Sequence, residues 1–157
     1  MIGDSGYTVG RLVSLLATVG GAVALAWSIK GLTTRWSVGL LAAGLFLTQN
    51  LTALLWAPLH RVDPLAVGLT LTGLAFATAG RPSLAGFAFL LALLTKQTYV
   101  VAPLAVAVAL WPCRASLARF AGVLVGGGVL AFLIAQALTG GWLCGTPSRP
   151  TATSLTW

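Results

Sequence analysis

Residues 83–111 read SLAGFAFLLALLTKQTYVVAPLAVAVALW, and this stretch decides the architecture that we predict for the chain. Two apolar runs, 83–94 and 99–111, meet at the polar joint 95–98. As α-helices each run reaches only roughly 18–20 Å, whereas the hydrocarbon core of a bilayer is about 30 Å thick. Joined, they would form one helix of roughly 43 Å with Lys96 in its middle. We therefore predict a short helical hairpin with Lys96 at its tip.

The composition of the chain favours a membrane environment. Hydrophobic residues make up 58% of the sequence and charged residues 7%, whereas a soluble domain carries about 25% charged residues. So few charges leave no polar coat to face water. Outside the hairpin, four apolar segments have the roughly 17–25 residues that a membrane span needs: 12–29, 36–56, 64–80 and 120–139. We predict an all-α, polytopic transmembrane helical bundle of about six segments within residues 1–142.

The basic residues give this bundle an orientation. With the hairpin, one side of the membrane collects Lys30, Arg35, Arg81, Arg114 and Arg119. The other side collects Arg11, Arg61 and Lys96. The positive-inside rule places the first side in the cytoplasm and both ends of the bundle outside it. A single helix through 83–111 would give three against four, which is a weaker bias.

Aromatic residues agree with this orientation, because tryptophan and tyrosine concentrate at membrane–water interfaces. Trp27, Trp36 and Trp111 fall at the predicted cytoplasmic ends, and Trp56, Tyr99 and Trp142 at the outer ends.

Two smaller features complete the structural prediction. Gly122 and Gly126 form a GxxxG pattern in segment 120–139, which predicts the close approach of a neighbouring helix. The polar N-terminus before Arg11 is expected to be a solvated loop that contains Asp4.

Several function classes do not fit the residues. The net charge of +7 does not indicate nucleic-acid binding, because the basic residues are scattered singly or in pairs without interleaved aromatics. Two cysteines and one histidine provide no metal-ligand spacing. Asp4 and Asp63 are the only carboxylates, so a hydrolase site built on paired carboxylates is not expected. No serine has the context of a nucleophile elbow.

Two polar joints carry the candidate site, and the predicted topology places both on the outer side. Arg61 and Lys96 together are suited to hold a phosphate, since arginine offers a planar fork of donors and lysine a point charge. Asp63 is a candidate to orient Arg61, to accept a proton or to contact a sugar hydroxyl. His60 and Gln97 are supporting candidates, and His60 is also a candidate general base.

A structural role accounts for the same residues without a site. Arg61 and Asp63 would pair locally at the start of a helix that has Pro64 in its first turn. Lys96 would extend its ammonium to the membrane interface.

Three short strings carry a family resemblance. They are GRLVSLLA at 10–17, RVDPLA at 61–66 and LLTKQT at 93–98. In this order and spacing they resemble bacterial membrane glycosyltransferases of the dolichyl-phosphate-mannose-protein-mannosyltransferase-like group, in the GT-C superfamily. The resemblance runs from about residue 3 to residue 142.

The resemblance implies sugar transfer from a polyprenyl-phosphate carrier to a lipid, glycan or protein acceptor, on the extracytoplasmic face of the bacterial inner membrane. In such enzymes a catalytic aspartate follows the first transmembrane helix, and basic residues near the outer surface hold the carrier phosphate. By this resemblance Arg61 and Lys96 hold the phosphate and Asp63 lies beside them. No cofactor is required, and a divalent cation stays open.

The chain also departs from this pattern. In the family, the string at 10–17 follows the first outer loop, so we expect this chain to lack the catalytic aspartate and the C-terminal half. Apolar patterning ends after Trp142. Codons allowed for 143–157, read one register over, can encode a stretch that contains His and Asn and fits the family. We hypothesise a frameshift near residue 143, which would make the tail 143–157 non-native.

Two other function classes stay open. A transporter or permease fragment would use polar residues of segment 36–56, such as Gln49 and Asn50, together with the 95–98 joint as a midplane substrate site. A non-catalytic membrane scaffold would tolerate substitution of Arg61 and Lys96 without any loss of activity.

Overall fold

The computed structural model describes residues 3–55 and 63–139, and these residues form an all-helical chain. Six α-helices and one 3₁₀-helix follow in the order α1 (Gly3–Thr33), α2 (Trp36–Leu55), α3 (Asp63–Thr78), α4 (Pro82–Thr95), η1 (Gln97–Val100), α5 (Val101–Ala109) and α6 (Arg114–Leu138). The all-α prediction is confirmed for the described residues, among which there is no strand.

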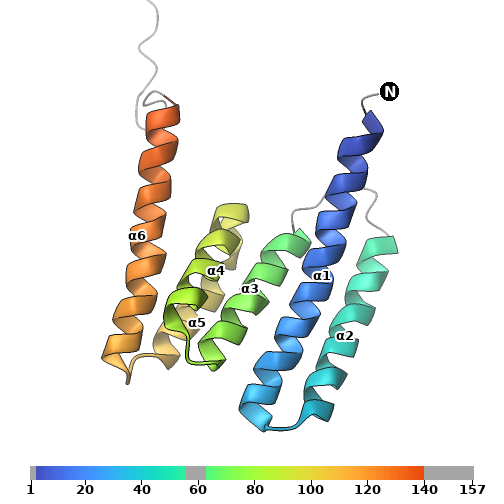
Figure 1. Ribbon diagram of the computed structural model, residues 1–157, viewed down its shortest axis with the longest axis horizontal. Helices are drawn as coiled ribbons and strands as arrows, with labels where there is room; N and C mark the ends of the chain where they lie inside the picture. The colour runs from blue at the N-terminus through green and yellow to red at the C-terminus, as the bar shows by residue number, and fades with distance from the viewer. Residues whose placement is uncertain (1–2, 56–62, 140–157) are drawn as a thin grey trace, which may run out of the picture.

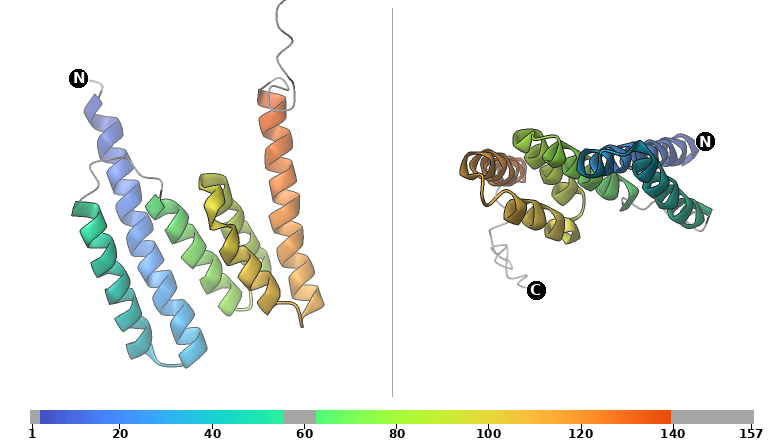
Figure 2. Two further views of the ribbon diagram at one scale, coloured as in Figure 1. Left: turned by 180° about the vertical axis from the view of Figure 1, so that it is seen from behind. Right: turned by 90° about the horizontal axis from the view of Figure 1, so that it is seen from below.

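The helices stand side by side in an open row (Figure 1). Helix α1 packs between α2 and α3, α4 packs between α3 and α6, and α5 lies to one side of this row (Figure 2). Successive helices alternate in direction, so the connections α1–α2, α3–α4 and α5–α6 all lie at one end of the molecule. At the other end α1 and α6 extend past the ends of α3 and α4.

The predicted break at 95–98 is confirmed. Helix α4 ends at Thr95, and Lys96 has an extended backbone with φ −155° and ψ 115°. The chain then turns through η1 into the nine residues of α5, which returns beside α4. A helix cannot continue through an extended residue, so the two apolar runs form a hairpin and not one long span.

A tight turn closes the opposite end of the α3–α4 pair. Gly80 has φ +70°, a conformation that a residue without a Cβ adopts at little cost. The Gly80 amide donates to the Ala77 carbonyl and the Arg81 amide to the Phe76 carbonyl, at 3.1 and 2.9 Å. This is the Schellman pattern of helix termination, and it lets α4 start immediately and run antiparallel to α3.

Glycines bring the helices of the row close together. A Cβ added at Gly68 of α3 would lie 2.5 Å from the Ala17 carbonyl oxygen of α1, and one added at Gly39 of α2 would lie 2.5 Å from the Ala26 carbonyl oxygen. Both helix pairs therefore meet backbone to backbone, as small residues allow in membrane bundles.

The predicted contact through Gly122 and Gly126 is wrong for the described part of the chain, because a Cβ at either position would have nothing within 4 Å. Helix α6 is rotated so that Gly127 meets Leu90 of α4 instead. The GxxxG face therefore points away from the row.

The larger of two small cores joins α3, α4, α5 and α6. Its buried members are Ala85, Phe89, Val106 and Phe120. The rings of Phe89 and Phe120 meet edge to face, with centroids 6.0 Å apart, which is a favourable arrangement of aromatic rings. The other core consists of alanines of α1 and α2, namely Ala22, Ala26 and Ala43.

Two helices begin earlier than predicted. Helix α1 already includes Asp4, so the expectation of a loop there is wrong. Helix α6 begins at Arg114 and not at Phe120. Residues 114–120 contain no Gly or Pro that would stop a helix.

Buried hydroxyl groups are satisfied inside their own helices. Thr18, Ser28 and Thr70 are buried, and each donates to the carbonyl four residues earlier, at 2.7–2.8 Å. This local pairing leaves these groups without need of water.

Many large apolar side chains lie on the surface. Leu32 is 74% exposed, Leu41 67% and Leu138 82%. Among the described residues two helices are long and apolar enough to cross a membrane, Val9–Thr33 within α1 and Arg114–Leu138. Only 6% of the apolar span of α6 is buried, whereas the core helix of a water-soluble protein is mostly buried. The four other helical stretches are apolar but shorter.

Candidate functional site

Lys96 and Asp63 form an ion pair at the end of the row where α1 and α6 extend further. The Lys96 ammonium donates to Asp63 Oδ1. Asp63 is the first residue of α3 and Lys96 follows the last residue of α4. The two residues lie 33 positions apart in the sequence, and they meet because α3 and α4 are antiparallel and similar in length.

Each charge also suits its own helix. A carboxylate is favourable at the N-terminus of a helix and an ammonium at the C-terminus, each by about 0.3–1 kcal/mol. Asp63 and Lys96 occupy these positions on α3 and α4. The ion pair therefore adds to two helix-terminus interactions that already favour both charges.

The pair keeps free hydrogen-bonding capacity. An ammonium has three donors and a carboxylate two acceptor oxygens, and among the described residues Lys96 Nζ donates only to Asp63. The side chains of Lys96 and Asp63 are 40% and 33% exposed. Two N–H donors of Lys96 can therefore meet an incoming anion without breaking the ion pair.

The structure brings together two of the predicted site residues and leaves the others apart or outside its scope. Gln97 is exposed at the start of η1. Arg61 and His60 lie outside the described residues, so the predicted pairing of Arg61 with Asp63 stays a prediction. The tail 143–157 also lies outside them.

Sequence reasoning missed the pairing of Lys96 with Asp63. Part of the signal was nevertheless present, since only a short joint separates the two apolar runs at 64–80 and 83–94. Such a hairpin places the first residue of one helix opposite the last residue of the next.

The polar residues that a transporter would use as a substrate site, Gln49 and the 95–98 joint, lie on helices that do not pack on each other. Gln49 is exposed on α2, and α2 packs on α1. Helices α1 and α3 separate α2 from α4, which carries Lys96 at its end (Figure 1). The side chain of Asn50 lies outside the described part of the structure.

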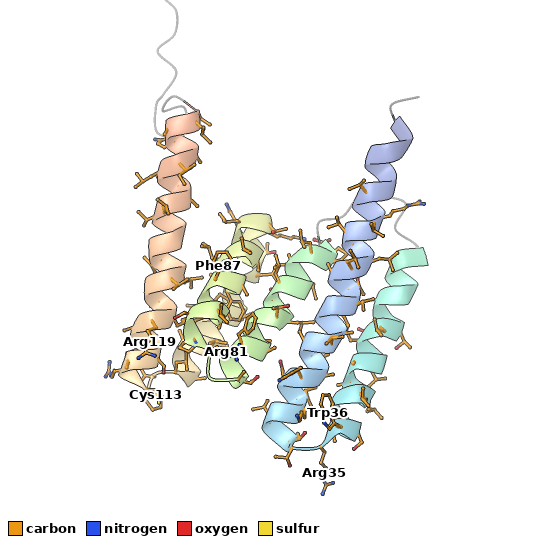
Figure 3. The ribbon with its side chains drawn as sticks, in the orientation of Figure 1. Arg35, Trp36, Arg81, Phe87, Cys113 and Arg119 are labelled. Carbon is orange, nitrogen blue, oxygen red and sulfur yellow. The ribbon has the colours of Figure 1, made fainter. Side chains whose placement is uncertain are left out.

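The opposite end of the row is basic and aromatic. Arg35, Arg81 and Arg119 lie there together with Trp36 and Cys113 (Figure 3). Lys30 Nζ lies 4.5 Å from the ring centroid of Trp36 and 5.9 Å from that of Trp27. Arg114 Cζ lies 4.8 Å from the ring centroid of Trp111. The sequence predicted that these residues lie on one side of the bundle, but it did not predict the cation–π contacts between them.

No metal centre is apparent among residues 3–55 and 63–139, since no three His, Cys, Asp or Glu side chains gather there. Cys113 is a free, exposed thiol, and Cys144 lies outside these ranges.

Comparison of the chain with protein-family models, curated proteins and solved structures finds no match. The function is therefore argued from the residues and their arrangement.

Proposed function

We propose that the chain is part of a polytopic inner-membrane glycosyltransferase that transfers a sugar from a polyprenyl-phosphate carrier to an extracytoplasmic acceptor. The observation that carries this proposal is the ion pair of Lys96 with Asp63. It joins two of the three strings on which the family resemblance rests, RVDPLA and LLTKQT.

The membrane placement is supported by the apolar surface and by the distribution of charge. In water, exposed leucines such as Leu41 and Leu138 would each carry a free-energy cost of about 25 cal/mol per Å² of apolar area. Lipid removes this penalty. Lys30, Arg35, Arg81 and Arg114 lie in or next to the connections at one end of the row, which the positive-inside rule assigns to the cytoplasm.

Helix lengths support a position of the ion pair near the outer side of a bilayer. At about 1.5 Å per residue, α3 and α4 are roughly 24 and 21 Å long, whereas α1 and α6 are roughly 46 and 37 Å. A hydrocarbon core is about 30 Å thick. Counted from the proposed cytoplasmic end, α3 and α4 stop short of the outer surface, which supports a position of Lys96 and Asp63 just below the outer headgroups, within reach of a carrier phosphate.

In this proposal Lys96 is the phosphate-binding residue and Asp63 is a positioning residue. Asp63 holds the ammonium through Oδ1, and the two remaining N–H groups donate to oxygens of the carrier phosphate. Arg61, two positions before Asp63, adds a second cation with a planar fork of donors.

The transfer is written as an inverting displacement at the anomeric carbon. An acceptor hydroxyl oxygen forms a bond to this carbon while the bond to the phosphate oxygen breaks, and polyprenyl phosphate leaves with the bonding electron pair. The hydroxyl proton passes to a base that we do not assign within this chain. Lys96 and Arg61 stabilise the negative charge that develops on the phosphate, an effect worth about 2.7–4 kcal/mol for one well-placed donor.

Carrier binding tests the proposal. The protein in detergent is titrated with a short polyprenyl phosphate, and binding is followed for the native chain, Lys96→Gln and Lys96→Arg. We expect Lys96→Gln to weaken binding about tenfold, since a charge-assisted hydrogen bond contributes about 1.5–3 kcal/mol, and Lys96→Arg to restore part of it. Arg11→Gln, on a helix that does not pack on α4, is the control.

Unchanged binding in Lys96→Gln would remove the proposed role of Lys96 and favour a non-catalytic scaffold. Equal loss in Arg11→Gln would show that binding depends on total charge and not on this site. Saturable binding of a polar solute without carrier binding would favour a transporter.

A further inference from the structure

We infer that the basic end of the row is a binding surface for the headgroups of anionic phospholipids. The basic end is defined here by Lys30, Arg35, Arg81, Arg114 and Arg119. This inference rests on the membrane placement proposed above, but it is independent of sugar transfer.

Among the described residues, no carboxylate lies at the basic end. The sequence contains two carboxylate side chains in total. Asp63 begins α3 and Asp4 lies in the first turn of α1, so both belong to the end of the row opposite the basic end. Five cations at one end, with no carboxylate of the described residues beside them, favour an external anion.

Cation–π contacts hold two of these cations at the level of the aromatic belt. Lys30 stands over Trp36 and Trp27, and Arg114 stands over Trp111, with distances to the ring centroids of 4.5, 5.9 and 4.8 Å. The three rings are half or more exposed, at 50–60%. Tryptophan prefers the headgroup level of a bilayer, so each ring fixes its cation where lipid phosphates lie.

A phospholipid fits this surface better than a nucleic acid does. Immediately inside the basic end, the helices carry exposed apolar side chains, such as Leu41 of α2 at 67% and Val108 of α5 at 73% exposure. The surface thus offers cations at its rim and an apolar collar below it. A phosphate attached to acyl chains matches both parts, whereas a nucleic acid would leave the apolar collar uncovered.

Lipid-specific quenching of tryptophan fluorescence tests the inference. Trp56, Trp142 and Trp157 are replaced by Phe, so that the signal comes from Trp27, Trp36 and Trp111. The chain is reconstituted in mixed vesicles that carry bromine on the acyl chains of either phosphatidylglycerol or phosphatidylcholine. We expect stronger quenching by brominated phosphatidylglycerol. The ratio of the two quenching signals reports headgroup preference and does not depend on the overall brightness of the rings.

Substitution of single cations measures how much each contributes to the preference for phosphatidylglycerol. Lys30→Gln and Arg114→Gln are each expected to reduce the preference for phosphatidylglycerol roughly fivefold, as for a basic residue near a charged membrane surface. Arg11→Gln, a cation nearer the opposite end of α1, is expected to leave it unchanged.

Equal quenching by both lipids in a chain that floats with the vesicles would overturn the inference while leaving the membrane placement intact. An equal loss in Arg11→Gln would also overturn it, because the preference would then follow net charge. Failure to float with vesicles of either lipid would overturn both this inference and the membrane placement.

Discussion

Lys96, which follows the last residue of α4, is ion-paired with Asp63, which begins α3, across the open end of the α3–α4 hairpin. The turn at Gly80 closes the other end. The hairpin is therefore fixed at both ends, and the Lys96–Asp63 pair lies at the opposite end from the main cluster of basic residues. This arrangement separates the proposed carrier site from the proposed lipid-binding surface.

Removal of one partner of the ion pair tests its environment. We expect Asp63→Asn to lower the free energy of unfolding by about 2 kcal/mol, because an unpaired ammonium at a partly buried position is costly. The double variant Asp63→Asn/Lys96→Gln should recover at least half of this loss. Thermal melts of the detergent-solubilised protein measure both values. A loss in the double variant equal to the sum of the losses in Asp63→Asn and Lys96→Gln, measured separately, would show that the pair contributes nothing.

The surroundings of two glycines, Gly68 at the contact of α1 with α3 and Gly122 on the open face of α6, predict opposite effects of substitution by alanine. In Gly68→Ala the new Cβ would lie 2.5 Å from the Ala17 carbonyl oxygen, and we expect a loss of about 1–3 kcal/mol, as for other overpacked sites. Gly122→Ala meets no atom within 4 Å and should gain up to about 1 kcal/mol in helix propensity. The same melts measure both. A stable Gly68→Ala variant would contradict the close approach of α1 and α3.

Truncation of Phe89 is expected to weaken the core that joins α4 to α6. Phe89 is 1% exposed and meets Phe120 edge to face. Phe89→Ala should destabilise the protein by about 3 kcal/mol, at the low end for such substitutions, because lipid lessens the transfer contribution. Phe87→Ala, at an exposed position of the same helix (Figure 3), is the matched control. Similar melting temperatures for the two variants would contradict the described core.

The proposed orientation predicts which thiols react from outside the cell. Cys113 is exposed at the basic end, so in a Cys144→Ser background it should resist a membrane-impermeant maleimide in intact cells and react after permeabilisation.

Gln97→Cys in a background without Cys113 and Cys144 supplies the converse case, because Gln97 is exposed at the opposite end. It should react in intact cells. The reverse pattern of labelling for the two thiols would contradict the proposed orientation and indicate the opposite one.

Much of the architecture was predictable because it follows from local patterns. The apolar runs matched the helices closely at α2 and α4, where polar or proline-containing joints mark both ends. The break at Lys96 was predictable since neither run alone, nor both joined, fits the thickness of a bilayer. The helix starts at Gly3 and Arg114 were missed, because residues such as Asp4 and Arg119 lower the hydropathy without stopping a helix.

The sequence by itself determined which segments are helical, where the chain turns and which end collects the basic residues, although not every helix boundary. Each of these depends on the hydropathy, charge or conformational preference of neighbouring residues. Only the tertiary structure decided that Lys96 pairs with Asp63, that Gly68 and Gly39 form the close contacts, and that Gly122 faces away. These contacts depend on the relative level and rotation of packed helices, which is set by the sum of many distant side-chain contacts and not by any local pattern.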